Sequence, residues 1–212
     1  DKAVRPTNVM GASKRLAELL VQSQNGWGKP DRTKFMMVRF GNVVGSVGSV
    51  VPLFKRQIEK GGPVTVTHPE MTRYFMTIPE ACQLILQAGS MGTGGEIFIL
   101  DMGVPIKIAD MAEDLIRLSG FKPHEDIPIK YIGLRPGEKL KEELITEGEG
   151  IVETSHEKIM VLKGQDCDLS ILNGKLDRLI NLAAMQDKDG IRSALKGMLP
   201  EYNPDNGSGS LM

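Results

Sequence analysis

The chain has 212 residues, 41% of them hydrophobic and 25% charged, which is enough apolar material for one globular domain or one domain plus a small lobe and excludes a fibrous or disordered protein. Lys and Arg number 26 against 27 Asp and Glu, so a net charge of -1 offers no basic excess for nucleic acid and favours a small-molecule partner. No apolar run approaches the roughly 20 residues of a membrane-spanning helix, so we expect no membrane contact by this chain.

The first half of the chain alternates predicted helices and strands. Thr7 or Asn8 can cap a helix whose apolar residues recur at helical spacing up to the Asn25-Gly26 break. The next apolar run, at 35–40, is short and nearly continuous, which predicts a central parallel strand buried on both faces. A short helix at 52–60 and strands at 63–68 and 72–78 follow. The apolar positions assigned to the first helix are Val9, Ala12, Leu16, Leu19 and Leu20.

The second half continues the alternation. Pro79 can begin a helix, the run at 96–100 reads as a buried strand, and a helix over 108–119 ends at Gly120. We then expect a strand in PIKYIG (128–133), a helix in RPGEKLKEELI (135–145) and a last strand in EKIMVL (157–162). Two amphipathic helices over 169–199 and a loose tail over 201–212 complete the chain.

This order predicts an α/β fold: the C-terminal part of a Rossmann-like, doubly wound parallel sheet with a small α/β substrate-binding lobe. We assign 1–50 and about 77–105 to the dinucleotide-binding domain, 51–165 mainly to the substrate-binding lobe, and 166–212 to the C-terminal helices and tail. The glycine-rich stretch from Gly41 to Gly48 has neither the spacing of a dinucleotide fingerprint nor a following Lys-Ser/Thr, so it predicts a backbone turn at a strand end. Such a turn can still line a site, because ligands of open α/β sheets bind at the carboxyl ends of strands.

The cysteines and histidines give no sign of a cross-link or a metal. Cys82 lies in an apolar helical pattern and Cys167 in a polar stretch far along the chain, which is typical of reduced intracellular thiols. The histidines share no ligand spacing with one another or with the cysteines. We therefore expect no structural metal.

Several stretches in matching order carry a resemblance to a known family. DKAVRPTNVMGASKR, RFGNVVGSVGSVVPLFKRQI, GGPVTVTHPEMTRYFMTIPEA and LRPGEKLKEEL resemble the bacterial nucleotide-sugar 4,6-dehydratases of the CapD-like polysaccharide-biosynthesis group. These are extended short-chain dehydrogenase/reductases that act on UDP-N-acetylglucosamine, and the resemblance covers about 1–165. It implies that this chain is the C-terminal part of a longer enzyme, inactive by itself, whose cofactor-binding half precedes Asp1.

The resemblance also implies the chemistry. Hydride leaves sugar C4 for a nicotinamide, water is eliminated across C5 and C6, and the hydride returns to C6. Asp1 matches the acid that protonates the departing C6 hydroxyl, and Lys2 the base that removes the C5 proton. Lys14 matches the lysine of the Tyr-x-x-x-Lys motif, which binds the nicotinamide ribose. Met10 stands in place of the tyrosine, as in the larger members of this group, and a thioether cannot act as a base.

Binding residues follow from the same resemblance. The backbone from Arg39 through Phe40, Gly41 and Asn42 to Val43 would pass beside the nicotinamide, and Asn42 would reach the substrate diphosphate. Arg73 and Arg135 would hold the diphosphate, because guanidinium groups match phosphate oxygens. The predicted nucleoside ligands are Glu138 for the uridine ribose, the backbone of Val64 and Thr65 for uracil, and Lys55.

Several alternatives stay open. The chain could belong to a nucleotide-sugar epimerase or decarboxylase of the same superfamily, against which Met10 argues, or it could be a non-catalytic UDP-sugar-binding module. The cofactor could be NAD or NADP. The resemblance further implies a homo-oligomer in the cytoplasm, with the longer enzyme anchored at the inner face of the bacterial membrane.

Overall fold

The computed structural model describes residues 2–24, 33–46, 48–145, 150–162 and 169–204. The chain divides into two compact units. Unit 1 comprises Asp1–Arg39, Leu84–Asp101 and Glu143–Met212, and unit 2 comprises Phe40–Gln83 and Met102–Glu142. Helix α3 (Ile78–Met91) carries the chain from unit 2 back into unit 1. In the part of the chain that the structure describes, no helix combines the length and the apolar character needed to cross a membrane.

Unit 1 is built on a mixed four-stranded sheet of order β1-β6-β10-β9. Strand β1 (Met37–Arg39) runs parallel to β6 (Ile97–Leu100), with Val38 opposite Phe98. Strand β10 (Ile159–Leu162) runs antiparallel both to β6 and to β9 (Ile151–Glu153). Ile97, Ile99 and Leu162 form the apolar core beside this sheet.

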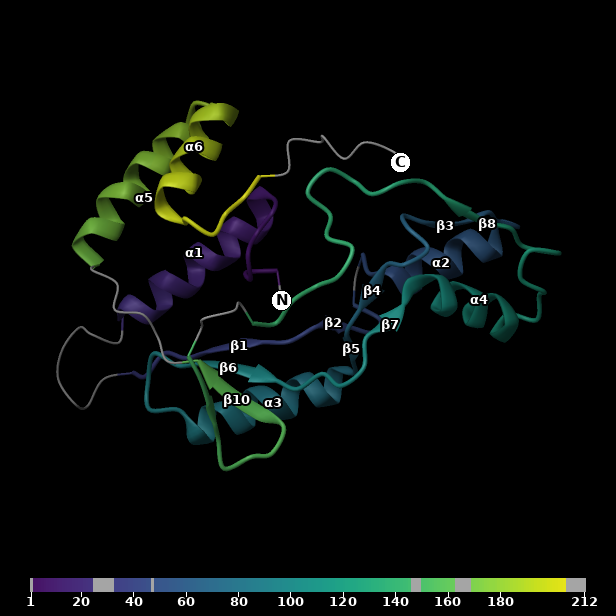
Figure 1. The fold of residues 1–212 in the computed structure, drawn as a ribbon, viewed down its shortest axis with the longest axis horizontal. Coiled ribbons are helices and arrows are strands. Elements are labelled where there is room, and N and C mark those ends of the chain that lie inside the picture. Colours follow the sequence, from purple (N-terminus) through teal and green to yellow (C-terminus); the bar gives the residue numbers. More distant parts are fainter. Residues whose placement is uncertain (1, 25–32, 47, 146–149, 163–168, 205–212) are drawn as a thin grey trace. The chain divides into compact units, whose positions relative to one another are not determined.

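Three helices form a second core in unit 1 (Figure 1). Helix α1 (Val9–Gln24) packs against α5 (Leu169–Ala184) and α6 (Lys188–Met198). Ala12 and Leu16 of α1 meet Leu195 and Leu199, all 5% exposed or less. This arrangement removes the apolar side of α1 from water, which is the main stabilisation available to an amphipathic helix.

Unit 2 is held together by a helix pair over short strands. Helix α2 (Val50–Glu59) and helix α4 (Ile108–Leu118) both contact β3 (Val64–Val66), which pairs in parallel with β8 (Ile129–Tyr131). Phe54, Val64 and Ile116 are among the residues of the core they share, each 1% exposed or less. Strand β2 (Asn42–Val43) pairs with β5 (Phe75–Met76), and β4 (Thr72–Arg73) with β7 (Ile106–Lys107).

Most of the predicted elements are present, and the exceptions have physical causes. The predicted strand at 35–40 is shorter than expected and only its end at Arg39 is buried, while Phe35 is 42% exposed. Among the described strands, β1 has β6 as its one neighbour, so it is not central there. The predicted strand at 72–78 is divided into β4 and β5 because the two halves pair with different partners.

The predicted helix over 135–145 is wrong. This segment has no helical residues, and Leu140 accepts a hydrogen bond from the Thr72 N–H at 3.1 Å. Gly137 has a φ of 73°, outside the helical region. Carbonyl groups that a helix would use internally are therefore committed to β4.

The predicted domain boundaries also differ from the two units. Residues 40–50 group with unit 2, because β2 pairs with β5 there. The region 143–165 and the C-terminal helices group with unit 1, where β10 joins the sheet and α5 and α6 join α1. The loose tail predicted over 201–212 is wrong at its start, because Tyr202 is 1% exposed and packs in the core with α1. Residues 205–212 and Cys167 lie outside the described residues, whereas Cys82 is an exposed free thiol.

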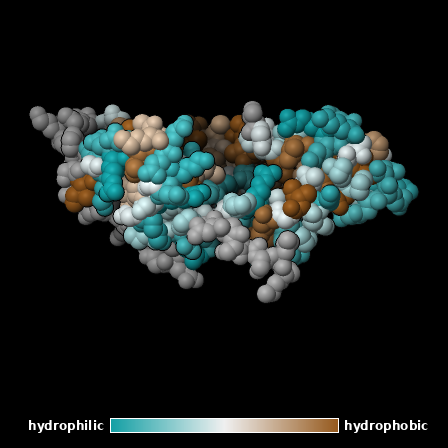
Figure 2. All heavy atoms as spheres, turned by 90° about the horizontal axis from the view of Figure 1, so that it is seen from above, coloured by the Kyte–Doolittle hydropathy of each residue, from teal (hydrophilic) through white to brown (hydrophobic). Residues whose placement is uncertain are grey.

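Hydrophobic side chains also reach the surface. In the view of Figure 2 they form separate groups between larger hydrophilic areas. Val9, which the helical pattern assigned to the core, is 42% exposed.

Candidate functional site

The start of α1 presents two of the predicted site residues together. The Gly11 N–H donates to Asn8 Oδ1 at 2.8 Å, so Asn8 caps the helix as the sequence predicted. Met10 is 51% exposed, and Lys14, one turn later, is also exposed. Residues four apart lie on the same helix face, so a thioether and an ammonium group lie side by side at this surface.

The backbone of Lys2 lies against this same turn. A Cβ atom placed on Gly11 would be 2.6 Å from the carbonyl oxygen of Lys2 and 3.0 Å from Pro6 Cβ. Only glycine permits that approach, so Gly11 explains how the chain before α1 can lie directly over it. Lys2 is half-buried. The structure therefore brings together Lys2 and the start of α1, while Asp1 lies outside the described residues.

A buried ion network lies further along α1. Arg39 at the end of β1 is 2% exposed, and its Nε and Nη2 atoms donate to the two carboxylate oxygens of Glu18, each at 2.8 Å. Arg15 Nη1 donates to Glu18 Oε2 at 2.9 Å, and its Nε donates to Glu201 Oε1 at 2.9 Å. Burial alone would raise the pKa of Glu18, but the hydrogen bonds and charges of Arg39 and Arg15 outweigh it and hold that pKa below its ordinary value.

This ion network determines the contacts of the Arg39 side chain. Arg39 Nη1 also donates to the Leu144 carbonyl oxygen at 3.4 Å, so the guanidinium binds a backbone carbonyl as well as both carboxylate oxygens of Glu18. It ties β1 to α1 within unit 1. The sequence predicted only that the backbone at Arg39 passes a cofactor, and it gave no sign that Glu18 would be the partner.

In unit 2, the predicted cofactor segment is held by its backbone. The Asn42 N–H donates to the Tyr74 carbonyl oxygen at 2.8 Å, and Val43 pairs with Met76. A Cβ on Gly41 would lie 2.6 Å from Tyr74 Cβ, so glycine is required for the two strands to approach. Phe40, Asn42 and Val43 are each half-buried.

Arg73 is the most extensively engaged cation of unit 2 among the described contacts. It is 8% exposed, and its Nη1 donates to the carbonyl oxygens of Thr72 (2.7 Å) and Leu140 (3.1 Å). Its Nη2 donates to the Lys139 carbonyl oxygen at 2.8 Å, and its Nε lies 3.7 Å from Glu142 Oε1. The Glu142 side chain is 7% exposed, so this carboxylate and Arg73 are buried together. Arg73 therefore fixes the path of the 135–142 segment.

That segment presents Arg135 and Glu138. Arg135 is exposed, and its N–H donates to Glu138 Oε2 at 3.1 Å. Thr67 Oγ1 donates to Glu138 Oε1 at 3.4 Å, and Arg73 Nη2 lies 4.0 Å from the same oxygen. Both carboxylate oxygens of Glu138 are thus engaged. Arg135, three residues earlier, adds an exposed guanidinium to the same segment of unit 2.

The predicted uracil-binding backbone is already hydrogen-bonded. The Val64 N–H donates to the Pro128 carbonyl oxygen at 2.9 Å, and the Thr65 N–H donates to Gln57 Oε1 at 3.0 Å. Gln57 Nε2 donates to Thr65 Oγ1 at 2.7 Å. Lys55 of α2 is exposed.

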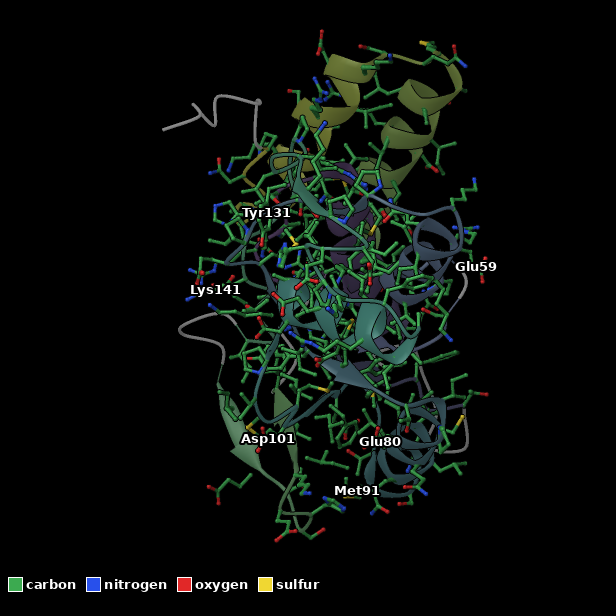
Figure 3. All side chains as sticks on the ribbon, turned by 90° about the vertical axis from the view of Figure 1, so that its right-hand side faces the viewer. Glu59, Glu80, Met91, Asp101, Tyr131 and Lys141 are labelled. Carbon is green, nitrogen blue, oxygen red and sulfur yellow. The ribbon has the colours of Figure 1, made fainter. Side chains whose placement is uncertain are left out.

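In Figure 3, Glu59 at the end of α2 lies on the opposite side of unit 2 from Tyr131 and Lys141.

Sequence reasoning missed the residues that hold these groups in place. Glu18 and Glu142 are the buried carboxylates that pair with Arg39 and Arg73, and Gln57 accepts a hydrogen bond from the Thr65 N–H of β3. A helical spacing of three between Arg15 and Glu18 was a signal for one of these pairs. Contacts between residues far apart in the chain leave no such local pattern. Within the described ranges, no group of three or more His, Cys, Asp and Glu residues could hold a metal ion.

The chain is similar in sequence to known polysaccharide biosynthesis proteins. Residues 1–164 match a family model described as polysaccharide biosynthesis protein. The capsular polysaccharide biosynthesis protein CapD of Staphylococcus aureus is 64% identical over 159 residues, which are 75% of this chain and 26% of that protein. The probable polysaccharide biosynthesis protein EpsC of Bacillus subtilis is 58% identical over 172 residues, 81% of this chain and 28% of that protein. The chain thus spans about a quarter of the length of these relatives.

Other matches carry enzyme names. A UDP-glucose 4-epimerase of Rickettsia canadensis is 40% identical over 146 residues, 69% of this chain and 41% of the epimerase. The solved structure of Pen from Bacillus thuringiensis is similar with a TM-score of 0.69 and 40% identity over 76% of this chain and 50% of that chain. DesIV, a dTDP-glucose 4,6-dehydratase from Streptomyces venezuelae, aligns with a TM-score of 0.53 and 18% identity over 64% of this chain and 41% of that chain. The predicted α/β fold with a Rossmann-like sheet is confirmed.

Proposed function

Because the chain belongs to the polysaccharide biosynthesis protein family, we propose that it forms part of a UDP-N-acetylglucosamine 4,6-dehydratase, which makes a UDP-4-keto-6-deoxy sugar by dehydration. The region is of the type found in nucleotide-sugar dehydratases and epimerases of the short-chain dehydrogenase/reductase superfamily. The observation that carries the proposal is the exposed pair Met10 and Lys14 at the start of α1. A lysine without a tyrosine base at this place fits a reaction whose proton transfers depend on other groups.

The residues at the start of α1 fit a nicotinamide dinucleotide as cofactor. Lys14 offers an exposed ammonium group that can bind ribose hydroxyls and that favours negative charge nearby. The chemistry that NAD or NADP supplies when bound is acceptance and return of the hydride. Met10 supplies an apolar contact and takes no proton, so another group must take the C4 hydroxyl proton when hydride leaves C4. Lys2 is the described residue proposed to remove the C5 proton, and Asp1 is proposed to protonate the departing C6 hydroxyl.

Unit 2 is proposed to bind the UDP moiety. Arg135 contributes an exposed guanidinium for the diphosphate, and Glu138 a carboxylate for the ribose hydroxyls. Arg73 is proposed to act through the 135–142 segment that it holds, with Asn42 and Lys55 contributing to the same nucleotide. Because the Val64 and Thr65 N–H groups are already bonded and the backbone of Val64 faces β8, the Thr65 carbonyl oxygen is the backbone group proposed to meet uracil, next to Val64.

Product analysis tests the proposal. The full-length protein containing these residues is incubated with UDP-N-acetylglucosamine, and the sugar is followed by NMR and mass spectrometry. We expect the product to have lost the mass of one water molecule and to show a new methyl signal, as a 4-keto-6-deoxy sugar requires. A C4 epimer that keeps its 6-hydroxyl would overturn the proposal.

Two other functions have specific support. The 40% identity to a UDP-glucose 4-epimerase favours epimerisation as the second candidate, and the same product analysis decides between them. Residues 1–212 alone could serve as a UDP-sugar-binding module, because unit 2 has its own core and its own polar surface. For this chain alone we expect weak UDP-sugar binding by calorimetry and no turnover.

A further inference from the structure

A short segment at the end of α6 contacts the chain that precedes α1. The Asn203 N–H donates to the Pro6 carbonyl oxygen at 3.0 Å, and Glu201 Oε1 accepts from Arg15 Nε at 2.9 Å. Between them Tyr202 is 1% exposed and belongs to the core shared with α1. This segment lies outside residues 1–164, which the family model matches.

The segment is itself fixed by α6. Lys196 Nζ donates to the Pro200 carbonyl oxygen at 3.1 Å and to the Tyr202 carbonyl oxygen at 2.6 Å. Leu199 is fully buried in the same core. The backbone of residues 201–203 is therefore fixed to the buried C-terminal end of α6.

The residue before Pro6 has a backbone conformation that needs support. Arg5 has a φ of 36°, a left-handed backbone that side chains other than glycine rarely adopt, and such residues persist where their surroundings hold them. Val4 and Pro6 on either side are buried, and Arg5 Nε donates to Glu143 Oε2 at 3.1 Å. The chain before α1 is thus held on one side by Glu143 and on the other by Asn203.

We infer that the segment Glu201–Asn203 is a positioning element for the reaction: by binding Pro6 and Arg15 it holds residues 2–6 over Gly11, so that Lys2 lies against the start of α1. This inference rests on the proposed function for its catalytic part. The physical part concerns unit 1 alone, because residues 2–6, α1 and 201–203 all belong to it. The Lys2 carbonyl oxygen is so near Gly11 that a displacement of residues 2–6 moves Lys2 away from the helix.

A matched pair of variants at one position isolates the contact. Asn203→Pro removes the backbone N–H that Pro6 accepts from, whereas Asn203→Ala keeps that N–H and removes only an exposed side chain. Amide hydrogen exchange is measured on the peptide containing residues 3–5 in the full-length protein. We expect exchange to be about five to ten times faster in Asn203→Pro than in Asn203→Ala, which is the effect of losing one hydrogen bond. Unchanged exchange of this peptide in Asn203→Pro would overturn the inference.

Because Pro at 203 also restricts the residue before it, Glu201→Gln provides a second variant. It removes the charge that pairs with Arg15 and leaves the backbone unrestricted, and it too is expected to speed exchange at 3–5. If Tyr202 packing alone held residues 2–6, Glu201→Gln and Asn203→Ala would exchange alike, which contradicts the inference.

Turnover tests the catalytic part in the same preparations. In Asn203→Pro we expect kcat to fall at least fivefold with KM for UDP-N-acetylglucosamine unchanged, because unit 2 is not altered, and Asn203→Ala to keep both values. Faster exchange at 3–5 with an unchanged kcat would refute positioning for the reaction. If the unaltered protein has no dehydratase activity, the proposed function fails, and the exchange measurement still decides whether 201–203 holds residues 2–6.

Discussion

Arg39 and Glu18 form a bidentate ion pair inside unit 1, with both N–O distances at 2.8 Å and with Arg39 2% and Glu18 8% exposed. Arg39 ends β1 and Glu18 lies on the third turn of α1, so this pair joins the sheet to the helix that presents Met10 and Lys14. Arg15 extends it to Glu201 near the C-terminus. Two arginines thus meet at the Glu18 carboxylate, and Arg15 links it to a third part of the sequence at Glu201.

Removing that carboxylate should destabilise the protein strongly. Glu18→Gln leaves Arg39 buried without its counter-charge, and breaking a buried pair in this way costs about 3 kcal/mol in the free energy of unfolding. Urea unfolding followed by circular dichroism measures it. Glu113→Gln is the control, because Glu113 pairs with Arg117 on the exposed surface of α4. Equal stability of the two variants would contradict a structural role for the Glu18 network.

The same pair predicts how stability depends on pH. The pKa of Glu18 lies below its ordinary value of 4.5, because its bonds to Arg39 and Arg15 outweigh the effect of burial. A carboxyl with a lowered folded-state pKa stabilises the fold fully above the unfolded-state pKa and loses that contribution as the pH falls through the folded-state value. The difference in unfolding free energy between the unaltered protein and Glu18→Gln should therefore be constant near neutral pH and shrink below about pH 4.5. Unfolding curves at pH 7, 5 and roughly 3.5 measure it, and a difference that grows on acidification would refute this assignment.

A pair of glycines tests the close approach of β2 and β5. Gly41→Ala places a Cβ 2.6 Å from Tyr74 Cβ, and overpacking of this kind costs about 1–3 kcal/mol. Gly89→Ala on α3 meets nothing within 4 Å and should stabilise the helix by about 0.5–1 kcal/mol. Thermal unfolding of both variants gives the comparison. If Gly41→Ala unfolds at the temperature of the unaltered protein, the two strands can separate without loss, contrary to the structure.

Local patterns in the sequence were sufficient for the helices and for several strands. The amphipathic spacing in 169–199 predicted α5 and α6, and Asn8 was one of the two predicted caps of α1, because these features depend on neighbouring residues. The 135–145 segment has the composition of a helix, yet Arg73 takes the carbonyl groups of Lys139 and Leu140. That competition comes from a residue more than sixty positions away, and no local pattern records it. The same applies to Glu201 beside Arg15 and to Asn203 beside Pro6.

The positions of Met10 and Lys14 make the sharpest test of the proposed chemistry. Met10→Leu keeps an apolar side chain of similar size where no proton transfer is proposed, so kcat should stay within about threefold of the unaltered value. Lys14→Ala removes the exposed ammonium group proposed to bind the cofactor ribose, and kcat/KM should fall by about two orders of magnitude. Lys175→Ala removes an exposed lysine from α5 and should leave kcat/KM unchanged, which controls for the loss of a surface charge. A Met10→Leu variant as impaired as Lys14→Ala would mean that the thioether itself takes part in the reaction.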